Sequence, residues 1–362
     1  MDNIQLTSTS VLALEDTQKM IEQLLKDYFD ENIVHAQLIG PEYTALWHAM
    51  QTLINAGGKR LRPRLVIMAF KAFSKKPLQT ILPVAAAQEL LHFGLLVHDD
   101  IIDRDYVRYG IKNVSGQLNE LYKKFLSDET ERRHFSDSAA MLAGDLAISG
   151  AYQLIIRAGL ATKQMIDAQR ILGDVFFAVA GGELLDMEST FRPAGTVDTV
   201  SVALHKTSSY SFVGPIVTGA MLADADLQSI EALRVYAQNL GIAYQLTDDL
   251  LGVFGDEKRM GKSASHDIRE GKYTYLIEQC MKYANSNDMS ILHDLFGKHS
   301  LQDHEAENFR EMLLRCGAKE RTEAAVQYYR KSALDALKDA HMDGSSRKQF
   351  ENLVRQATDR AL

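Results

Sequence analysis

Apolar residues recur along most of the chain at spacings of three and four, which is the pattern of amphipathic helices. Near the start, one helical face would carry Leu12, Ile21, Leu24, Leu25, Tyr28 and Phe29. The same pattern predicts helices over residues 41–54, 64–73, 78–102, 139–158, 164–187, 198–222, 227–253, 273–282 and 304–341. Alternating strand patterns bounded by hairpin turns are missing. We therefore predict an all-α fold.

Length and composition indicate one large core. The chain has 362 residues, of which 46% are hydrophobic and 24% are charged, as is usual for a globular protein. It has only 6 prolines and no linker rich in Pro, Gly or Ser, which favours a single helical domain over residues 1–362. The motifs described below fall within about 50–280, and C-terminal helices are expected over 281–362.

The net charge, the N-terminal sequence and the cysteine spacing limit the kinds of partner and the cellular location that we expect. A net charge of −8 gives no general attraction to nucleic acid or to anionic membranes, so any anion site must be local. The N-terminus lacks a signal-peptide pattern, and no stretch of about 18 uninterrupted apolar residues occurs. We expect a cytoplasmic chain without a transmembrane segment, although a greasy product could bring it into transient membrane contact. Cys280 and Cys316 show no metal-type spacing and are expected to be reduced.

Two acidic clusters, about 150 residues apart, carry the candidate chemistry. In a helix, Asp99 and Asp103 are one turn apart on the same face, and Asp248 would project similarly from a second helix. Each cluster alone could be a solvated helix face or an N-cap. Long apolar runs precede both, however, and a desolvated carboxylate needs a partner. Because Mg²⁺ completes a sparse carboxylate shell with water and phosphate, we predict a diphosphate substrate.

Two basic, glycine-containing segments could hold that diphosphate. The first is Gly57-Gly58-Lys59-Arg60-Leu61-Arg62-Pro63-Arg64, in which Pro63 suits the first turn of a helix. A helix N-terminus beside Lys and Arg binds phosphate well. The second segment follows the second acidic cluster and contains Lys262 and Lys272. A mobile loop there could cover a metal-bound diphosphate, and the alternative for either segment is an exposed polar turn.

Taken together, these motifs resemble those of a known family. The chain contains GGKRLRP at 57–63, ELLHFGLLVHDDIID at 89–103, LAGD at 142–145, KT at 206–207, YQLTDD at 244–249 and GK at 261–262. Their order and spacing are similar to those of the trans-isoprenyl diphosphate synthases, the polyprenyl synthetase family. The resemblance implies packed helices around a deep central cavity, a homodimer, and Asp-rich helices that face each other. It also implies condensation of an allylic diphosphate with isopentenyl diphosphate, head to tail.

The resemblance assigns roles by matched position. Three Mg²⁺ ions would be held by Asp99, Asp103 and Asp248 and would draw off the allylic diphosphate, leaving a cation that isopentenyl diphosphate attacks. The allylic diphosphate would be held by Arg108, Lys206, Lys262 and Lys272. Isopentenyl diphosphate would be held by Lys59, Arg62 and His92, although a histidine on an apolar helix is more often a core residue. Thr207 and Gln245 would turn oxygens toward the cation.

The chain departs from the family's pattern at three positions. The second arginine after the first Asp motif is Tyr109, whose neutral hydroxyl cannot replace a bidentate guanidinium. The second motif ends in Gly252 instead of an aspartate, with Asp256 as a substitute four residues on. Glu183 stands where a glutamine is usual. In addition, the polar segment 112–138 is longer than is typical, and we expect it to be a solvent-facing excursion or a partner surface.

The resemblance also suggests a product length. Gly94, five residues before Asp99, cannot close the cavity floor as an aromatic side chain would, so Leu91, Phe176 or Phe177 would set a deeper floor. We expect a product of C20 or longer, with geranylgeranyl diphosphate first and a longer polyprenyl diphosphate close behind. Two alternatives stay open. A partner-dependent or non-catalytic subunit would fit the departures, whereas a terpene cyclase would not need Lys59, Arg62 and His92.

Overall fold

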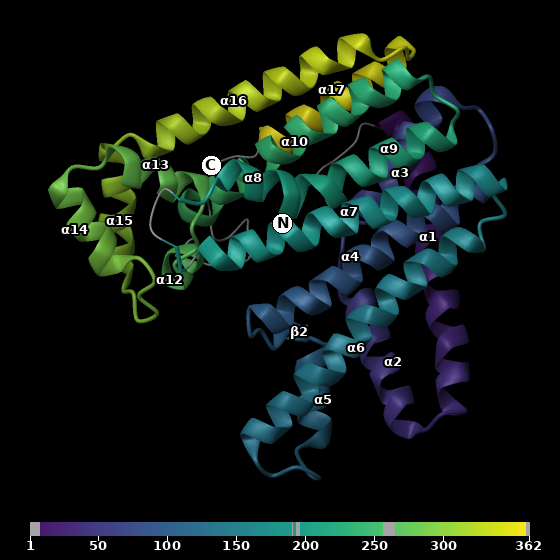
Figure 1. Ribbon diagram of the computed structural model, residues 1–362, viewed down its shortest axis with the longest axis horizontal. Helices are drawn as coiled ribbons and strands as arrows, with labels where there is room; N and C mark the ends of the chain where they lie inside the picture. The colour runs from purple at the N-terminus through teal and green to yellow at the C-terminus, as the bar shows by residue number, and fades with distance from the viewer. Residues whose placement is uncertain (1–7, 190, 193–195, 256–264, 360–362) are drawn as a thin grey trace. The chain divides into compact units, whose positions relative to one another are not determined.

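The computed structural model describes residues 8–189, 191–192, 196–255 and 265–359, and it is helical almost throughout (Figure 1). The prediction of an all-α fold is confirmed. Contacts within the chain form two compact units. One unit contains the chain up to Leu172 apart from Lys71–Phe73, and the other contains Lys71–Phe73 and the chain from Gly173 onward. The single-domain prediction concerns how the units are joined, and it stays a prediction.

The first unit contains the helices that carry the first acidic cluster. Its elements are α1 (Ser8–Gln37), α2 (Pro41–Ala56), α3 (Leu61–Phe73, ending in the other unit), η1 (Leu78–Thr80), α4 (Leu82–Ile102), β1 (Val107–Arg108), β2 (Ile111–Lys112), α5 (Val114–Tyr122), α6 (Glu129–Ile156) and the start of α7 (Thr162–Ser189). The buried Phe29 ring lies 5.9 Å from Trp47 and 6.0 Å from Phe93, edge to face. These aromatic contacts join α1, α2 and α4 in one core.

Helices α4 and α6 lie side by side at very close range, because glycines stand at their contact (Figure 1). A methyl group on Gly94 would lie 2.9 Å from the Gly144 carbonyl oxygen and 2.9 Å from Cγ1 of Ile148. One on Gly144, within the LAGD motif, would lie 2.1 Å from Nε2 of His98. Gly94 therefore allows close packing of α4 against α6. The argument from Gly94 to a product of C20 or longer stays a prediction.

A short hairpin interrupts the helices, and the sequence analysis missed it. Val107 pairs with Lys112 and Arg108 with Ile111 in an antiparallel register. The two loop residues, Tyr109 and Gly110, have φ angles of 55° and 76°. Two positive φ angles in a two-residue loop are the requirement of a type I′ turn. The hairpin has only two residues per strand, too few for an alternating pattern to be visible.

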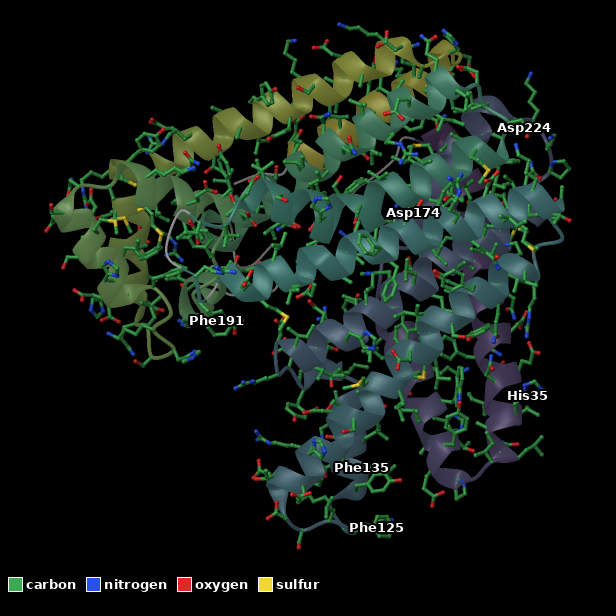
Figure 2. All side chains as sticks on the ribbon, viewed as in Figure 1. His35, Phe125, Phe135, Asp174, Phe191 and Asp224 are labelled. Atoms are coloured by element: carbon green, nitrogen blue, oxygen red, sulfur yellow. The ribbon has the colours of Figure 1, made fainter. Side chains whose placement is uncertain are left out.

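The segment 112–138 is a packed helical pair and only partly the excursion that its charge suggested. One face of α5 is buried, including Val114 and Leu118. The Arg132 side chain is 8% exposed, and its guanidinium donates to the Leu126 carbonyl oxygen at 2.8 Å. Figure 2 shows Phe125 and Phe135 near the end of this pair, where they extend away from the rest of the ribbon. The polar residues of the segment therefore stabilise a local fold.

The second unit is built around α10. Its elements are the rest of α7, α8 (Thr199–Val202), η2 (Ala203–Val213), α9 (Gly214–Leu222), α10 (Leu227–Phe254), α12 (His266–Glu270), α13 (Tyr275–Tyr283), α14 (Ser286–Leu295), α15 (Asp303–Arg315), α16 (Ala318–Ala336), η3 (Leu337–Asp339) and α17 (Gly344–Thr358). Leu246 and Leu250 of α10 pack in one apolar cluster with Leu276, Phe309 and Leu313. α16 runs along α10 (Figure 1). This core fixes the helix that bears the second acidic cluster.

The prediction of one helix over 304–341 was wrong. The chain turns between α15 and α16 at Gly317, whose φ is 70°. Glycine takes this left-handed conformation without the Cβ penalty of other residues. Both helices contribute to the same apolar cluster, so the apolar pattern alone did not reveal the break.

By length and composition, two stretches could cross a membrane, Leu78–Ile102 and Glu129–Ile156. In their most apolar windows, 72% and 50% of the residues are buried inside the structure. Core helices of soluble proteins pass the same test, so the finding is weak evidence for a span. The expectation of no transmembrane segment stays a prediction.

Candidate active site

The first acidic cluster lies at the C-terminal end of α4, beside the hairpin. Asp99 is in the last turn, and Asp103 is the C-cap, whose N–H donates to the Asp99 carbonyl oxygen at 2.8 Å. The Arg108 guanidinium donates to Asp99 Oδ2 at 3.1 Å and to Asp100 Oδ1 at 2.6 Å. The hairpin thus places one cation against two neighbouring carboxylates of the motif. Arg108 was predicted to hold diphosphate, and this contact keeps it next to a predicted metal ligand.

Asp100 is the most deeply buried carboxylate of this motif. It is 2% exposed, and burial raises its pKa to about 6 although Arg108 opposes the shift. Its second oxygen, Oδ2, is buried without a hydrogen-bond partner among the described residues. Buried carboxylate oxygens are usually hydrogen-bonded, so this oxygen can accept from a further donor or a cation.

A basic cluster lies on the same unit and brings together three of the predicted residues. Burial lowers the pKa of His92 well below its ordinary value, and the nearby cations of Arg62, Arg108 and Arg60 lower it further. His92 is therefore neutral and can donate or accept a hydrogen bond. The arginines that lower the pKa of His92 also make its surroundings positive. These surroundings therefore suit an anionic ligand. Lys59, one residue before Arg60, is exposed.

Arg60 differs from its basic neighbours because it has a structural role. Its guanidinium is buried against Glu89 Oε1 at 3.0 Å and the Ile54 carbonyl oxygen at 2.8 Å. Its φ of 50° turns the chain at the start of α3. The turn leaves Lys59 and Arg62 on either side of an anchored residue. An ion pair this well buried is expensive to break, so Arg60 fixes the loop.

Tyr109 occupies the position of the family's second arginine and packs on the glycine turn. A methyl group on Gly57 would lie 2.9 Å from Cγ of the Tyr109 ring. Desolvation raises the pKa of the Tyr109 phenol, while the nearby Arg108 and Arg62 guanidinium groups lower it. The ring therefore covers Gly57. It lies near Arg108, which was assigned to the allylic diphosphate, and near Arg62, which was assigned to isopentenyl diphosphate.

We predict that Tyr109→Arg lowers the Michaelis constant for isopentenyl diphosphate. A guanidinium beside Arg62 and Arg108 would add a bidentate contact that the phenol cannot make. Steady-state kinetics at a saturating allylic diphosphate concentration would measure the change, with Tyr109→Phe as the control that removes only the hydroxyl. An unchanged or higher constant would exclude a direct contact at this position.

A second group of predicted residues lies on α7, η2 and α10. The Thr207 hydroxyl donates to Gln245 Oε1 at 2.6 Å, and the Gln245 amide donates to Asp249 Oδ1 at 2.8 Å. The Lys206 ammonium contacts Glu183 Oε1 at 2.9 Å and Asp186 Oδ2 at 2.6 Å. A pocket is lined by Asp186, Thr199, Val202, Ala203, Lys206, Thr207, Gln245, Asp249, Lys272, Tyr273, Thr274 and Tyr275. The structure therefore gathers Lys206, Thr207, Gln245 and Lys272, all predicted site residues, around one hollow.

An unusual helix places Lys206 and Thr207 in this pocket. The segment Ala203–Val213 is a π-helix within a stretch that was predicted to be one ordinary helix. A methyl group on Gly182 of α7 would lie 2.2 Å from the Lys206 backbone nitrogen. On the other side, one on Gly241 of α10 would lie 2.4 Å from Cβ of Ser208. Two glycines thus let η2 approach its neighbours closely, and π-helices are frequent at functional sites.

Glu183, which stands where the family usually has a glutamine, forms an ion pair. Its carboxylate contacts the Lys206 ammonium, which also pairs with Asp186 one turn further along α7. The three side chains are each about one-fifth exposed, at 19%, 18% and 24% for Glu183, Asp186 and Lys206. Glu183 and Lys206 are 23 residues apart in the sequence, so no local motif indicated their contact.

Burial also perturbs Asp249. It raises the pKa to about 7 from 3.8, although Lys272 and the Gln245 amide act in the opposite direction. The folded protein therefore holds this carboxyl protonated at pH 5 and ionised at pH 8. In the unfolded chain it ionises near its ordinary value. Since the folded state binds the proton more tightly, stability from this group is greatest at low pH and falls as the pH rises toward 7.

Asp249→Asn should raise the melting temperature of the metal-free protein more at pH 8 than at pH 5. At pH 8 the substitution removes a buried charge, whereas at pH 5 it replaces a carboxyl that is already neutral when folded. Thermal unfolding with a chelator at both pH values would measure the difference. An equal gain at the two pH values would contradict the raised pKa.

Several predicted residues cannot be placed in one arrangement. Lys262 and Asp256 lie outside the described residues. Asp99, Asp103, Lys59, Arg62, His92 and Arg108 belong to the first unit, while Asp248, Lys206, Thr207, Gln245 and Lys272 belong to the second. The expectation that the two Asp-rich helices face each other therefore stays a prediction. Within the described ranges, no group of three or more His, Cys, Asp or Glu side chains is placed to hold a metal ion.

Comparisons with known proteins show which family this chain belongs to. The polyprenyl synthetase family model matches residues 44–313. A short chain isoprenyl diphosphate synthase of Methanocaldococcus jannaschii is 30% identical over 294 residues, covering 81% of this chain and 80% of the relative. A geranylgeranyl diphosphate synthase of Methanosarcina mazei is 30% identical over 297 residues, covering 81% and 84%.

Solved structures extend the likeness to nearly the whole chain. A geranylgeranyl pyrophosphate synthase from Corynebacterium glutamicum, complexed with isoprenyl diphosphate and magnesium, has a TM-score of 0.86 at 29% identity and covers 95% of this chain and 99% of that one. A polyprenyl synthase from Caulobacter crescentus, complexed with calcium and isoprenyl diphosphate, has a TM-score of 0.76 at 25% identity, with 97% and 96% covered. The chain therefore belongs to the polyprenyl synthetase family and is a trans-prenyltransferase.

Proposed function

We propose that this prenyltransferase condenses an allylic diphosphate with isopentenyl diphosphate, head to tail, and releases a product of C20 or longer. The observation that carries the proposal is that each unit has its own cluster of basic side chains beside an acidic motif. One gathers Arg62, His92 and Arg108, and the other places Lys206 and Lys272 around a pocket. Two diphosphates need two such clusters, whereas a terpene cyclase ionises one. The names of the relatives, which include geranylgeranyl and geranylfarnesyl diphosphate synthases, support the class of reaction.

A divalent metal fits the acidic groups of both units. Oδ2 of Asp100 is buried without a hydrogen-bond partner among the described residues, and burial raises the pKa of both Asp100 and Asp249, so further positive charge would stabilise their ionised forms. We assign Mg²⁺, three ions in all, to Asp99, Asp103 and Asp248. When bound, the metal supplies Lewis-acid stabilisation of the charge that develops on the leaving diphosphate. Its hard oxygen ligands and preference for phosphate agree with the complexes of the two structural relatives.

The side chains of the chain itself perform the remaining tasks. Arg108 holds Asp99 and Asp100 in place before diphosphate arrives, and it is the cation best positioned to receive the substrate next to these carboxylates. Lys206 and Lys272 neutralise the allylic diphosphate in the second unit. The Thr207 hydroxyl and the Gln245 amide oxygen offer dipoles toward an allylic cation. Lys59, Arg62 and the neutral His92 hold isopentenyl diphosphate.

The side chains that set product length stay a prediction. Of those proposed from the sequence, Phe177 is 83% exposed. Gly94 packs on α6, whereas Leu95 shares the helical face of His92 and Asp99. Leu95 is half-buried and Leu91 is fully buried, so these side chains are the candidates on α4 for contact with the growing tail. Geranylgeranyl diphosphate remains the first product that we propose.

Product analysis would test this function. The purified chain would be incubated with Mg²⁺, isopentenyl diphosphate and, separately, C5, C10, C15 and C20 allylic diphosphates, and the products identified by mass spectrometry. A defined C20 or longer chain would support the proposal. No product with any primer would favour a partner-dependent subunit, the alternative raised by Tyr109 and Gly252. A cyclised hydrocarbon would favour a cyclase.

A homodimer is part of the proposal. On α7, Phe177 and Leu184 lie two turns apart and are 83% and 64% exposed, with Met187 at 40% on the next turn. Large apolar side chains grouped on a helix face are typical of an interface between chains. Light scattering after size-exclusion chromatography should give twice the mass of the 40.5 kDa chain. The Phe177→Glu and Leu184→Glu pair should give the monomer mass, and a dimer that survives both changes would place the interface elsewhere.

A further inference from the structure

The chain has only two cysteines, and the fold of the second unit brings them together. Cys280 lies on α13 and is fully buried, whereas Cys316 is the partly exposed C-cap of α15. The Cys280 thiol lies 3.2 Å from Sδ of Met312, which precedes Cys316 by one turn of α15 (Figure 1). Cys280 therefore meets the face of α15 that carries Cys316. The two thiols interact directly with each other, and neither takes part in the proposed reaction.

We propose that Cys280 and Cys316 are a redox-active pair, which a hydroperoxide converts to a disulfide and which a small dithiol converts back. Both thiols belong to one unit, so the bond needs no movement between units. The sulfur atoms of a disulfide are about 2.0 Å apart, so α13 and α15 must draw closer together. Cys316 stands where α15 ends and the chain turns at Gly317, whose φ is 70°. It can therefore move toward α13 without distorting a helix.

Cys316 is the thiol that reacts first. It stands just before the N-terminus of α16, where the Ala318 N–H donates to its sulfur. The contact with Cys280 lowers the pKa of the Cys316 thiol and this N–H lowers it further, while burial and the Asp288 carboxylate oppose both. The thiolate is the nucleophilic form, and a helix N-terminus favours it. The contact with Cys316 and burial raise the pKa of Cys280, which stays a thiol until its partner is oxidised.

The oxidation removes two electrons in two stages. The Cys316 thiolate attacks one oxygen of the hydroperoxide, and the O–O bond breaks. Cys316 becomes a sulfenic acid, and the other oxygen leaves with the proton that the thiol had lost. The Cys280 sulfur then attacks the Cys316 sulfur, the S–O bond breaks, and the departing hydroxide takes the Cys280 proton as water. Because the second thiol is already in contact, Cys316 is protected from further oxidation.

The disulfide would link the redox state of the pair to the pocket of the second unit. α13 begins at Tyr275, which lines that pocket with Lys272. Near the start of α16, the Lys319 ammonium lies 4.9 Å from the ring centre of Phe254, the last residue of α10. A bond that draws α13 toward the end of α15 therefore moves the pocket wall relative to α10. We expect oxidation to lower kcat/KM for the allylic diphosphate about tenfold. This effect on activity rests on the proposed function, whereas formation of the disulfide does not.

Peptide mapping by mass spectrometry without reductant would test the pair after treatment of the reduced, purified chain with hydrogen peroxide. We expect one disulfide within the chain, between Cys280 and Cys316, which dithiothreitol removes. In Cys280→Ala, Cys316 should stop at the sulfenic acid, which dimedone traps. In Cys316→Ala, Cys280 should stay reduced because it is buried. Melting temperatures of the reduced variants would show that both are folded.

Steady-state kinetics on the same samples would test the link to the pocket. Peroxide should lower kcat/KM of the unaltered chain and dithiothreitol should restore it, while both variants, which keep every methionine, should lose no activity. An unaltered chain that forms no disulfide, or forms one only between two chains, would overturn the inference. A disulfide that leaves the kinetics unchanged would overturn its link to the pocket. A reduced chain without prenyltransferase activity would instead overturn the proposed function, and peptide mapping would still decide whether the disulfide forms.

Discussion

Asp99→Ala should lower turnover by about three orders of magnitude, which corresponds to about 4 kcal/mol of transition-state stabilisation. Asp99 combines two roles in this site. It is a proposed metal ligand in the last turn of α4, and its Oδ2 accepts from Arg108 at 3.1 Å. Without it, the leaving diphosphate loses charge stabilisation, and Arg108 keeps only its contact with Asp100. The measurement is the initial rate of condensation under saturating substrates and Mg²⁺.

The loss should be catalytic and not structural. Because the Asp99 side chain is 25% exposed, its removal creates no buried cavity, and the melting temperature should stay close to that of the unaltered chain. Asp27→Ala on α1, which removes an exposed carboxylate from the same unit, is the control and should keep full activity. A rate for Asp99→Ala within tenfold of the unaltered chain would contradict the assigned role and favour a non-catalytic subunit.

Gly182→Ala should both destabilise the protein and strongly reduce its activity. The added methyl group would lie 2.2 Å from the Lys206 backbone nitrogen and 2.6 Å from the His205 carbonyl carbon. Since these are backbone atoms, no side-chain rotation can relieve the contact, and overpacking of this kind costs about 1–3 kcal/mol or more. The π-helix would have to move away from α7 with Lys206 and Thr207. Chemical denaturation and steady-state kinetics would measure the two effects.

The neighbouring glycine provides a matched control for this change. A methyl group on Gly181 would meet no atom within 4 Å, so Gly181→Ala should be tolerated. Alanine in a helix interior is favoured over glycine by roughly 0.5–1 kcal/mol, so this variant should be equally or slightly more stable. Equal stability of the Gly181 and Gly182 variants would show that η2 does not approach α7 as closely as described.

The all-α fold was predictable because it depends on local spacing, whereas the roles of the site residues came from the family resemblance and stay predictions. The apolar period of 3.6 residues located most of the long helices, and the interval between Asp99 and Asp103 placed them about one turn apart. The motif order also identified the family, which the comparisons confirm. The breaks were harder to find. The apolar spacing did not reveal the turn at Gly317 or the π-helix over Ala203–Val213.

The helical pattern, the family and the residue types of the two acidic motifs could therefore be obtained without coordinates. Tertiary structure decided which groups meet: Lys206 with Glu183 and Asp186, Arg108 with Asp99, and Cys280 with Cys316. Only the fold could reveal that Gly94 serves helix packing and that Phe177 is exposed. The physical reason is that a helix period is fixed by neighbours within a few residues, whereas these contacts depend on how distant backbones pack together.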